Sequence, residues 1–268
     1  MPSRTITAEP HGGIENIERL GAGHHVDSLV IIPTYNEADN LKVIAPQILN
    51  RGPFHVLIVD DNSPDGTGDL ADSLARCSNG RLSVLHRPGK MGLASAYLQG
   101  FAYALERDYS RIFQMDADLS HDPKALPLLR CALDRADVAL GSRYVPGGGT
   151  KDWPAHRQLL SRGGAQYARM VLGLPYRDLT SGFKAFKRHV LESFDLKTIK
   201  SEGYAFQIEM THRCHQMGFK IMEMPITFQD RRMGRSKIDR RIILEALIVV
   251  WRLRRSRLGE TVSEEIKA

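Results

Sequence analysis

The feature that most constrains the fold is a repeated unit in which a short apolar run ends in a polar turn and a helix-like segment follows. In "SLVIIPTYNEADN" we expect a strand over Leu29 to Ile32, ended by Pro33, and a helix over Asp39 to Leu49. In "HVLIVDDNSPDGTG" we expect a strand over His55 to Val59 and a helix from about Thr67. Strands that alternate with helices predict a parallel sheet.

Further units extend this pattern along the chain. "RLSVLHRP" precedes a helix expected over Ala94 to Glu106, "RIFQM" precedes a helix after Pro123, and "DVALGSRY" leads to a glycine-rich loop. The pattern predicts an α/β fold with a mainly parallel central sheet and helices on both faces. Three later helices, expected over His156 to Leu172, Tyr204 to Met217 and Arg240 to Arg255, and the strand-like "KIMEMPITF" complete the same domain.

Composition excludes several other classes of protein. The 268 residues are 42% hydrophobic and 25% charged, which is typical of a globular protein with a substantial core. The three cysteines form no CxxC pair, so neither a disulfide framework nor a structural zinc site is indicated, and a reducing, cytoplasmic setting fits best. The first 25 residues lack an apolar core segment, so we expect a mobile leader and not a signal peptide.

The positive charge is concentrated near the C-terminal end. Between Asp230 and Arg257 the chain carries ten basic residues and three acidic ones, a local charge of +7 against a total of +6. This asymmetry predicts an anionic partner at that end. The segment from Ile242 to Trp251 is too short to span a bilayer. It is either a core-packing helix with a solvated basic end or an interfacial helix, in which Arg252, Arg254, Arg255 and Arg257 face anionic lipid.

Polar residues follow most of the predicted strands. Because parallel strands end at the same edge of a sheet, these residues are expected to meet in one crevice. They are Asp60, Asp61, Arg87, Lys90, Asp116, Asp118, Ser142 and Arg143.

The stretch "IFQMDADLSHD" offers two interpretations. Asp116 and Asp118 are two residues apart, so both can face one ion, while Ala117 points away. Two carboxylates suit Mg²⁺ shared with a phosphorylated substrate, but a solvated acidic turn has the same composition. His121 and Asp122 are expected to cap the helix that begins at Pro123.

Several motifs in fixed order carry a resemblance to a known family. "PTYNE", "VDDNSPDGT" and "DADLSH" resemble the family-two glycosyltransferases, which have the nucleotide-diphospho-sugar-binding GT-A fold. "GSRY", "HRQLLSRGGAQYAR", "DLTSGFKAF", "EGYAFQIEM" and "DRRMGRSK" narrow it to dolichol-phosphate or polyprenol-phosphate mannose synthases. The resemblance covers about Leu29 to Lys237. It implies a GT-A catalytic domain over residues 26–237, followed by a basic amphipathic helix and tail over 238–268.

The resemblance also implies roles for individual residues. Asp116 and Asp118 would bind Mg²⁺ or Mn²⁺ on the donor diphosphate, and the relatives commonly have Gln at the position of Ser120. Asp118, Arg143, Arg231 and Lys237 are the expected catalytic residues. Expected contacts of the nucleotide and sugar further include Pro33, Tyr35, Glu37, Asp61, Lys90, Ala117, Ser120, Arg157, Gln207 and Glu209. Asp178 and Ser181 either bind the sugar or acceptor or form a helix cap and turn.

The implied reaction is transfer of mannose from GDP-mannose to a polyprenyl phosphate with inversion, giving a β-linked mannosyl phospholipid and GDP. Arginines and a metal would offset the repulsion between the donor diphosphate and the acceptor phosphate. The implied location is the cytoplasmic face of a membrane, with a membrane-anchoring protein as a partner. The alternatives are a UDP-glucose-dependent synthase of the same lipid class and a nucleic-acid-binding protein that uses the basic C-terminus. The near-neutral remainder of the chain and the lack of a base-stacking motif argue against nucleic acid.

Overall fold

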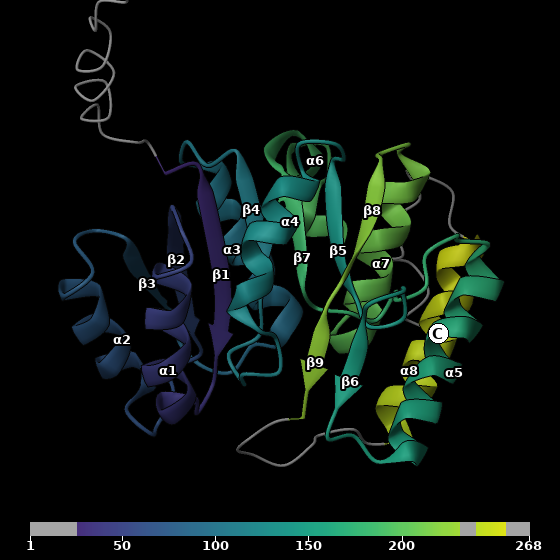
Figure 1. The fold of residues 1–268 in the computed structure, drawn as a ribbon, viewed down its shortest axis with the longest axis horizontal. Helices are drawn as coiled ribbons and strands as arrows, with labels where there is room; N and C mark the ends of the chain where they lie inside the picture. Colours follow the sequence, from purple (N-terminus) through teal and green to yellow (C-terminus); the bar gives the residue numbers. More distant parts are fainter. Residues whose placement is uncertain (1–25, 231–239, 256–268) are drawn as a thin grey trace, which may run out of the picture.

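The computed structural model describes residues 26–230 and the helix Arg240–Arg255. The predicted leader, Arg231, Lys237, Arg257 and the tail lie outside the described residues. A seven-stranded sheet has the order β3-β2-β1-β4-β7-β5-β8 and forms the centre of the fold (Figure 1). The strands are β1 (Ser28–Thr34), β2 (Phe54–Asp60), β3 (Leu82–His86), β4 (Arg111–Gln114), β5 (Val138–Ser142), β7 (Lys184–Lys187) and β8 (Ile221–Pro225). All paired neighbours are parallel except those of β7, so the predicted fold class is confirmed.

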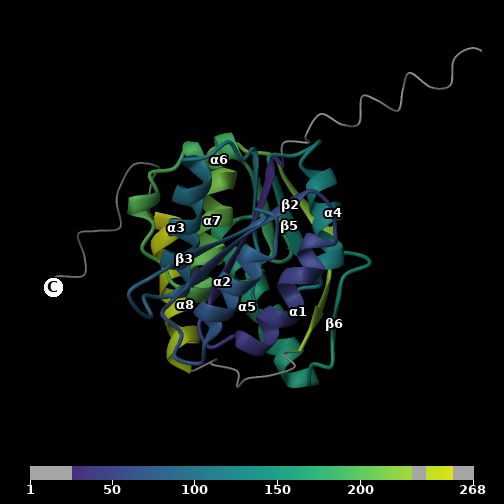
Figure 2. The same ribbon diagram turned by 90° about the vertical axis from the view of Figure 1, so that its left-hand side faces the viewer.

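Helices cover both faces of this sheet (Figure 2). Side chains of β1 alternate between the two faces. Val30 and Ile32 lie on one face and pack with α1 (Ala38–Leu49), α2 (Thr67–Arg76) and α4 (Leu126–Ala132). Leu29 and Ile31 point to the other face, which is covered by α3 (Leu93–Leu105), α6 (Arg188–Glu192) and α7 (Gly203–Gln216). Both faces of β1 are therefore core, as its continuous apolar run predicts.

Pro33 does not end the first strand, contrary to the prediction. β1 continues to Thr34, and Pro33 stands opposite Val59 of β2. The pairing of β1 with β4 stops at Ile31, so the missing N–H of Pro33 interrupts no ladder on that side.

Strand β7 is the main feature that the sequence pattern did not predict. It is antiparallel to both β4 and β5 and separates them in the sheet. Because β7 runs in the opposite direction, its first residue, Lys184, pairs with the last residue of β4, Gln114. The segment before β7, which includes Asp178 and Gly182, is thereby placed at the same edge as the carboxyl ends of the parallel strands.

The C-terminal part of the domain adds a small sheet and two long helices. β6 (Gly149–Lys151) pairs in parallel with β9 (Thr227–Gln229). α8 (Arg240–Arg255) packs against both α5 (Ala155–Leu172) and α7 (Figure 1). In α8, Val250 and Leu253 are buried, whereas Ile248 and Trp251 are about half exposed. No helix in the described part of the chain has the length and apolar character needed to cross a membrane.

Candidate active site

Asp116 and Asp118 follow β4 at the carboxyl edge of the sheet. Asp116 Oδ1 accepts a hydrogen bond of 2.9 Å from the Tyr97 hydroxyl on α3, and its side chain is 29% exposed. Asp118 is 6% exposed, and its Oδ1 accepts a hydrogen bond of 3.0 Å from the backbone N–H of Ser120. Leu119 has a φ of 61°, a left-handed conformation that L side chains rarely adopt. The two carboxylates are therefore held by a tight turn.

Tyr97 and His121 each form a hydrogen bond with Asp116 in this turn. Burial and the neighbouring Asp116 raise the pKa of Tyr97 well above its usual value, so its hydroxyl remains a donor. The His121 ring packs against Phe183 and Phe228, and its Nδ1 accepts a hydrogen bond of 3.3 Å from the Asp116 N–H. Burial lowers the pKa of His121, so the ring is neutral and carries its proton on Nε2.

The sequence interpretation of His121 as part of a helix cap was wrong. His121 is buried behind the carboxylates, and only Asp122 caps the following 3₁₀ turn, Pro123–Ala125, where its Oδ1 accepts from the Lys124 N–H. His121 is therefore buried, whereas its neighbour Asp122 is exposed. No sequence pattern pointed to Tyr97, because a tyrosine within an apolar helix is typical of the core.

The carboxylate pair fits a divalent cation that is shared with a ligand. Within residues 26–230 and the described part of α8, no group of three or more His, Cys, Asp or Glu side chains could hold a metal. Two aspartates supply the oxygen ligands that Mg²⁺ and Mn²⁺ accept, and they leave coordination positions for phosphate oxygens. A Cβ built on Gly182 would lie 3.4 Å from Asp116 Oδ2, so the glycine keeps this side of the pair open. The Ser120 hydroxyl, two residues after Asp118, is buried without a hydrogen-bond partner in the described part of the chain.

A second group of predicted residues gathers at the ends of β1, β2 and β3. Lys90 Nζ lies 4.6 Å from the centre of the Tyr35 ring, so these residues from two separate loops form one contact. Asp61 is buried, pairs with Arg87 at 2.9 Å and accepts a hydrogen bond from the Met91 N–H. Burial raises the pKa of Asp61, while Met91 and Arg87 oppose the shift.

Other residues of this group form hydrogen bonds or ion pairs with neighbouring residues of the same loops. Glu37 Oε2 accepts a hydrogen bond of 2.6 Å from Asn40, in the first turn of α1. Asp60 accepts hydrogen bonds from Thr34 and Ser63, which fix the turn after β2. Arg87 is buried against Asp61, so its guanidinium group is paired with this carboxylate and is not a free phosphate ligand.

Two of the predicted basic clamps are paired with carboxylates in the described structure. Arg143 Nε and Nη2 each lie 2.7 Å from the Asp178 carboxylate, and both side chains are almost fully buried. Burial alone would raise the pKa of Asp178, but Arg143 lowers it below its usual value. Arg157 donates to Asp230 at 2.6 Å and stacks over Trp153. Of the two roles left open for Asp178, the turn is the one that the structure shows: its carboxylate accepts a hydrogen bond from the Thr180 hydroxyl in the turn that follows, and it also anchors Arg143.

Gln207 and Glu209, both on α7, have different surroundings. Glu209 forms an ion pair of 2.6 Å with Arg213 one turn later, which is a structural contact. Gln207 is 3% exposed, and its Oε1 accepts a hydrogen bond of 2.6 Å from the buried Lys184. Its Nε2 has no hydrogen-bond partner among the described residues and lies, like Asp116, close to Gly182. Gln207 therefore presents an unused donor beside the carboxylate pair, and Lys184 is a site-supporting residue that sequence reasoning missed.

The chain matches a known protein family and is similar to two known enzymes. The model of "Glycosyl transferase family 2" matches residues 29–194. Polyprenol monophosphomannose synthase from Mycolicibacterium smegmatis is 48% identical over 85% of this chain and 87% of the relative. Undecaprenyl-phosphate mannosyltransferase from Micrococcus luteus is 44% identical over 86% of this chain and 98% of the relative.

Two solved structures share the fold at low sequence identity. Glucosyl-3-phosphoglycerate synthase from Mycobacterium tuberculosis, in complex with Mn²⁺, UDP and glucosyl-3-phosphoglycerate, aligns with a TM-score of 0.61 and 18% identity over 94% of this chain and 88% of that one. A mannosyltransferase from Pyrobaculum calidifontis, in complex with GDP-Man and Mn²⁺, aligns with a TM-score of 0.54 and 16% identity over 85% and 73%. The structure and the family match together show that the chain belongs to glycosyl transferase family 2 and is a glycosyltransferase with the GT-A fold.

Proposed function

We propose that the chain transfers mannose from GDP-mannose to a polyprenyl phosphate, with inversion at the anomeric carbon. The observation that carries the proposal is the Asp116 and Asp118 pair at the carboxyl edge of the sheet, where Asp116 and the Gln207 amide both lie close to Gly182. The support for the acceptor and the sugar is the similarity to a polyprenol monophosphomannose synthase and an undecaprenyl-phosphate mannosyltransferase.

Asp116 and Asp118 would hold Mg²⁺ or Mn²⁺, which supplies positive charge to the donor diphosphate. Tyr97 fixes the position of the Asp116 carboxylate, His121 accepts from the Asp116 backbone N–H, and the Ser120 N–H fixes the Asp118 carboxylate. The unused N–H of Gln207 is placed to donate to a sugar hydroxyl. On the nucleotide side, Asp61 would accept from base or ribose donors, and Tyr35 and Lys90, which contact each other, would bind the nucleotide beside it.

In the proposed step, an oxygen of the acceptor phosphate forms a bond to the anomeric carbon, and the bond from that carbon to the diphosphate breaks, releasing GDP. A phosphate monoester has a second pKa near 6, so at neutral pH the acceptor is already an anionic nucleophile. No general base is required. Arg143 stands at this edge, oriented by Asp178, and Arg231 and Lys237 remain proposed phosphate contacts outside the described residues.

We also propose a location at the cytoplasmic face of a membrane, since the proposed acceptor is a lipid. Support comes from the half-exposed Ile248 and Trp251 on α8, next to the exposed Arg252 and Arg255. Arg254 differs from these two, because it donates to the carbonyl of Val171 on α5. A membrane-anchoring protein partner remains part of this proposal.

The decisive assay offers labelled GDP-mannose or UDP-glucose to the protein with polyprenyl phosphate and either Mg²⁺ or Mn²⁺. We expect label to enter the lipid from GDP-mannose only when a divalent cation is present. Transfer from UDP-glucose alone would replace the proposed donor with the alternative one. Tight nucleic-acid binding without any sugar-nucleotide binding would contradict the proposal as a whole.

A further inference from the structure

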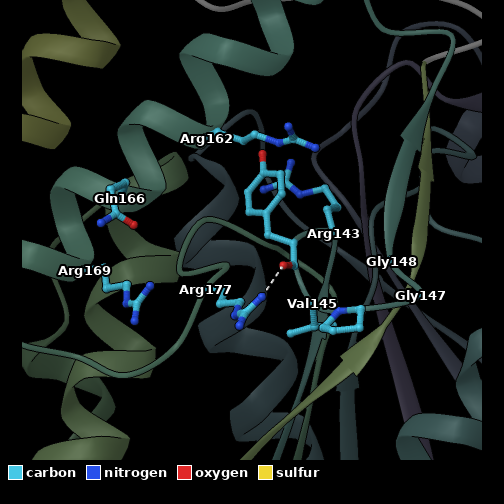
Figure 3. A pocket seen from close by; sticks show the side chains of 10 residues that line it. Arg143, Val145, Gly147, Gly148, Arg162, Gln166, Arg169 and Arg177 are labelled. Carbon is cyan, nitrogen blue, oxygen red and sulfur yellow. Dashed lines mark hydrogen bonds between the residues drawn. The ribbon is translucent and has the colours of Figure 1, made fainter.

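A cavity of about 580 Å³ lies beside the candidate active site and carries an unusual concentration of arginine (Figure 3). Its walls come from the loop that follows β5, from α5 and from the segment after α5. Along α5, Arg162, Gln166 and Arg169 are spaced by four and three residues, so they lie on one face of the helix. Arg177 and Arg143 line it from the other side. Arg143 is the one lining residue that also belongs to the candidate active site.

The charge of this cavity is not balanced within the described residues. Of its four arginines, only Arg143 has a carboxylate partner there, which is Asp178. Glu223, the other carboxylate at this wall, accepts from the backbone N–H groups of Arg177 and Asp178. Arg162, Arg169 and Arg177 therefore leave a positive cavity that calls for an anionic ligand.

The cavity is also structurally built and not a chance gap between flexible side chains. The Tyr144 hydroxyl donates to Ser161 at 2.7 Å and joins the β5 loop to α5. Arg177 Nη1 donates to the Tyr144 carbonyl at 3.4 Å (Figure 3). A Cβ on Gly148 would lie 2.5 Å from the Ser142 carbonyl, so this turn of the loop packs too closely for any side chain.

Exposed apolar side chains accompany the cavity on the same helix. Leu159 is 74% exposed and Met170 is 66% exposed. Leu159 lies two turns before Gln166 and Met170 one turn after it, so both are close to the face that carries Arg162 and Arg169. A phosphate flanked by hydrocarbon is the chemistry that such a surface matches.

We propose that this cavity binds the phosphate of an anionic membrane lipid, at a site separate from the one formed by Asp116 and Asp118. The guanidinium groups of Arg162, Arg169 and Arg177 bind the phosphate oxygens, and Leu159 and Met170 contact the acyl region. The inference rests on the proposed membrane location but not on the proposed reaction. Lipid binding and turnover can therefore fail separately.

The test is co-sedimentation of the full chain with vesicles of phosphatidylcholine, with or without phosphatidylglycerol, in the absence of nucleotide. The double variant R162Q/R169Q should bind the phosphatidylglycerol vesicles roughly 25-fold more weakly than the wild type, because each of the two basic residues near an anionic surface contributes about fivefold. R162K/R169K keeps the charge but loses the two-pronged geometry, so its binding should be intermediate. R51Q/R135Q removes the same charge from exposed positions outside the cavity and should change binding less than about twofold.

Two further measurements identify the ligand. At constant ionic strength, glycerol phosphate should compete with vesicle binding by the wild type but have no more effect on R162Q/R169Q than chloride does. Unchanged vesicle binding by R162Q/R169Q, with an intact melting temperature, would overturn the proposal. A raised KM of that variant for polyprenyl phosphate in neutral detergent, with vesicle binding unaffected, would assign the cavity to the acceptor phosphate and overturn it as well.

Discussion

Lys184 donates two hydrogen bonds to Gln207, one to its backbone carbonyl at 2.9 Å and one to its Oε1 at 2.6 Å. Because the amide oxygen of Gln207 faces Lys184, its NH₂ group faces Gly182 and the Asp116 side of the carboxylate pair. Lys184 begins β7, and Gln207 lies on α7. The relationship therefore joins the antiparallel strand to the helix that covers the candidate sugar site.

Gln207→Glu should distinguish the role of the amide oxygen, which accepts from Lys184, from that of the amide N–H, which faces the site. The variant keeps an acceptor for Lys184 but has no N–H to donate toward the site, so the fold should be retained while activity falls. Removing one donor to a reacting substrate typically lowers kcat by roughly 100-fold or more, and a ground-state contact acts mainly on KM. Steady-state kinetics with GDP-mannose, together with thermal melting, measures both. Activity equal to the wild type would contradict a substrate contact for Gln207.

Lys184→Met tests the positioning role directly. Losing the donor leaves Gln207 Oε1 buried without a partner, which costs about 1–3 kcal/mol of stability. The Gln207 amide is then free to rotate, so the activity of Lys184→Met should be lower than that of Lys184→Arg, which keeps a hydrogen-bond donor. A loss of stability without any change in kcat or KM would make the lysine a purely structural residue.

Lys184 should also give the stability a specific pH dependence. Burial lowers its pKa from 10.5 to about 7, so between these values the unfolded chain binds the additional proton and the folded chain does not. The free energy of unfolding therefore gains from Lys184 as pH rises from about 7 toward 10.5, at up to about 1.4 kcal/mol per pH unit. Urea unfolding of the wild type and of Lys184→Met can be compared at about pH 7.5 and about pH 9.5. The free energy of unfolding of the wild type, relative to that of the variant, should be larger at the higher pH. A difference independent of pH would contradict the assigned cause.

The features that the sequence predicted correctly are those that depend on neighbouring residues in the chain. The apolar runs and turn residues located β1 to β5 and their helices, and they placed Asp116 and Asp118 at a strand exit. Strand β7 has only four residues, and its pairing partners are far away in the chain, so no local period revealed it. The ion pair of Arg143 with Asp178 and the support of Gln207 by Lys184 both depend on that strand. Charged residues in a motif were therefore predicted as ligands although two of the arginines are paired within the fold.

The Arg143 and Asp178 pair should be among the most sensitive positions for stability. Asp178→Asn leaves a buried guanidinium without its carboxylate, a change that typically costs about 3–5 kcal/mol. Arg157→Gln breaks a more exposed pair with Asp230 and should cost about 1 kcal/mol or less. Chemical denaturation of the two variants compares them directly. Equal losses would show that burial of the Arg143 pair is not what sets its contribution.

Asp118→Asn should abolish metal-dependent transfer while leaving the fold intact. The substitution keeps the size of the side chain and an oxygen that can accept from the Ser120 N–H, but it removes one of the two negative charges offered to the cation. Asp122→Asn is a matched control, because Asp122 lies in the same acidic stretch but caps a 3₁₀ turn. That control should cost about 1 kcal/mol of stability or less and keep its activity, since asparagine is also a good cap. Mn²⁺ binding followed by magnetic resonance in the presence of GDP, together with melting temperatures, distinguishes loss of the metal from loss of the fold. Near-normal Mn²⁺ binding by Asp118→Asn would remove Asp118 from the metal site, and an equal loss in Asp122→Asn would point to the acidity of the whole turn instead of a defined pair of ligands.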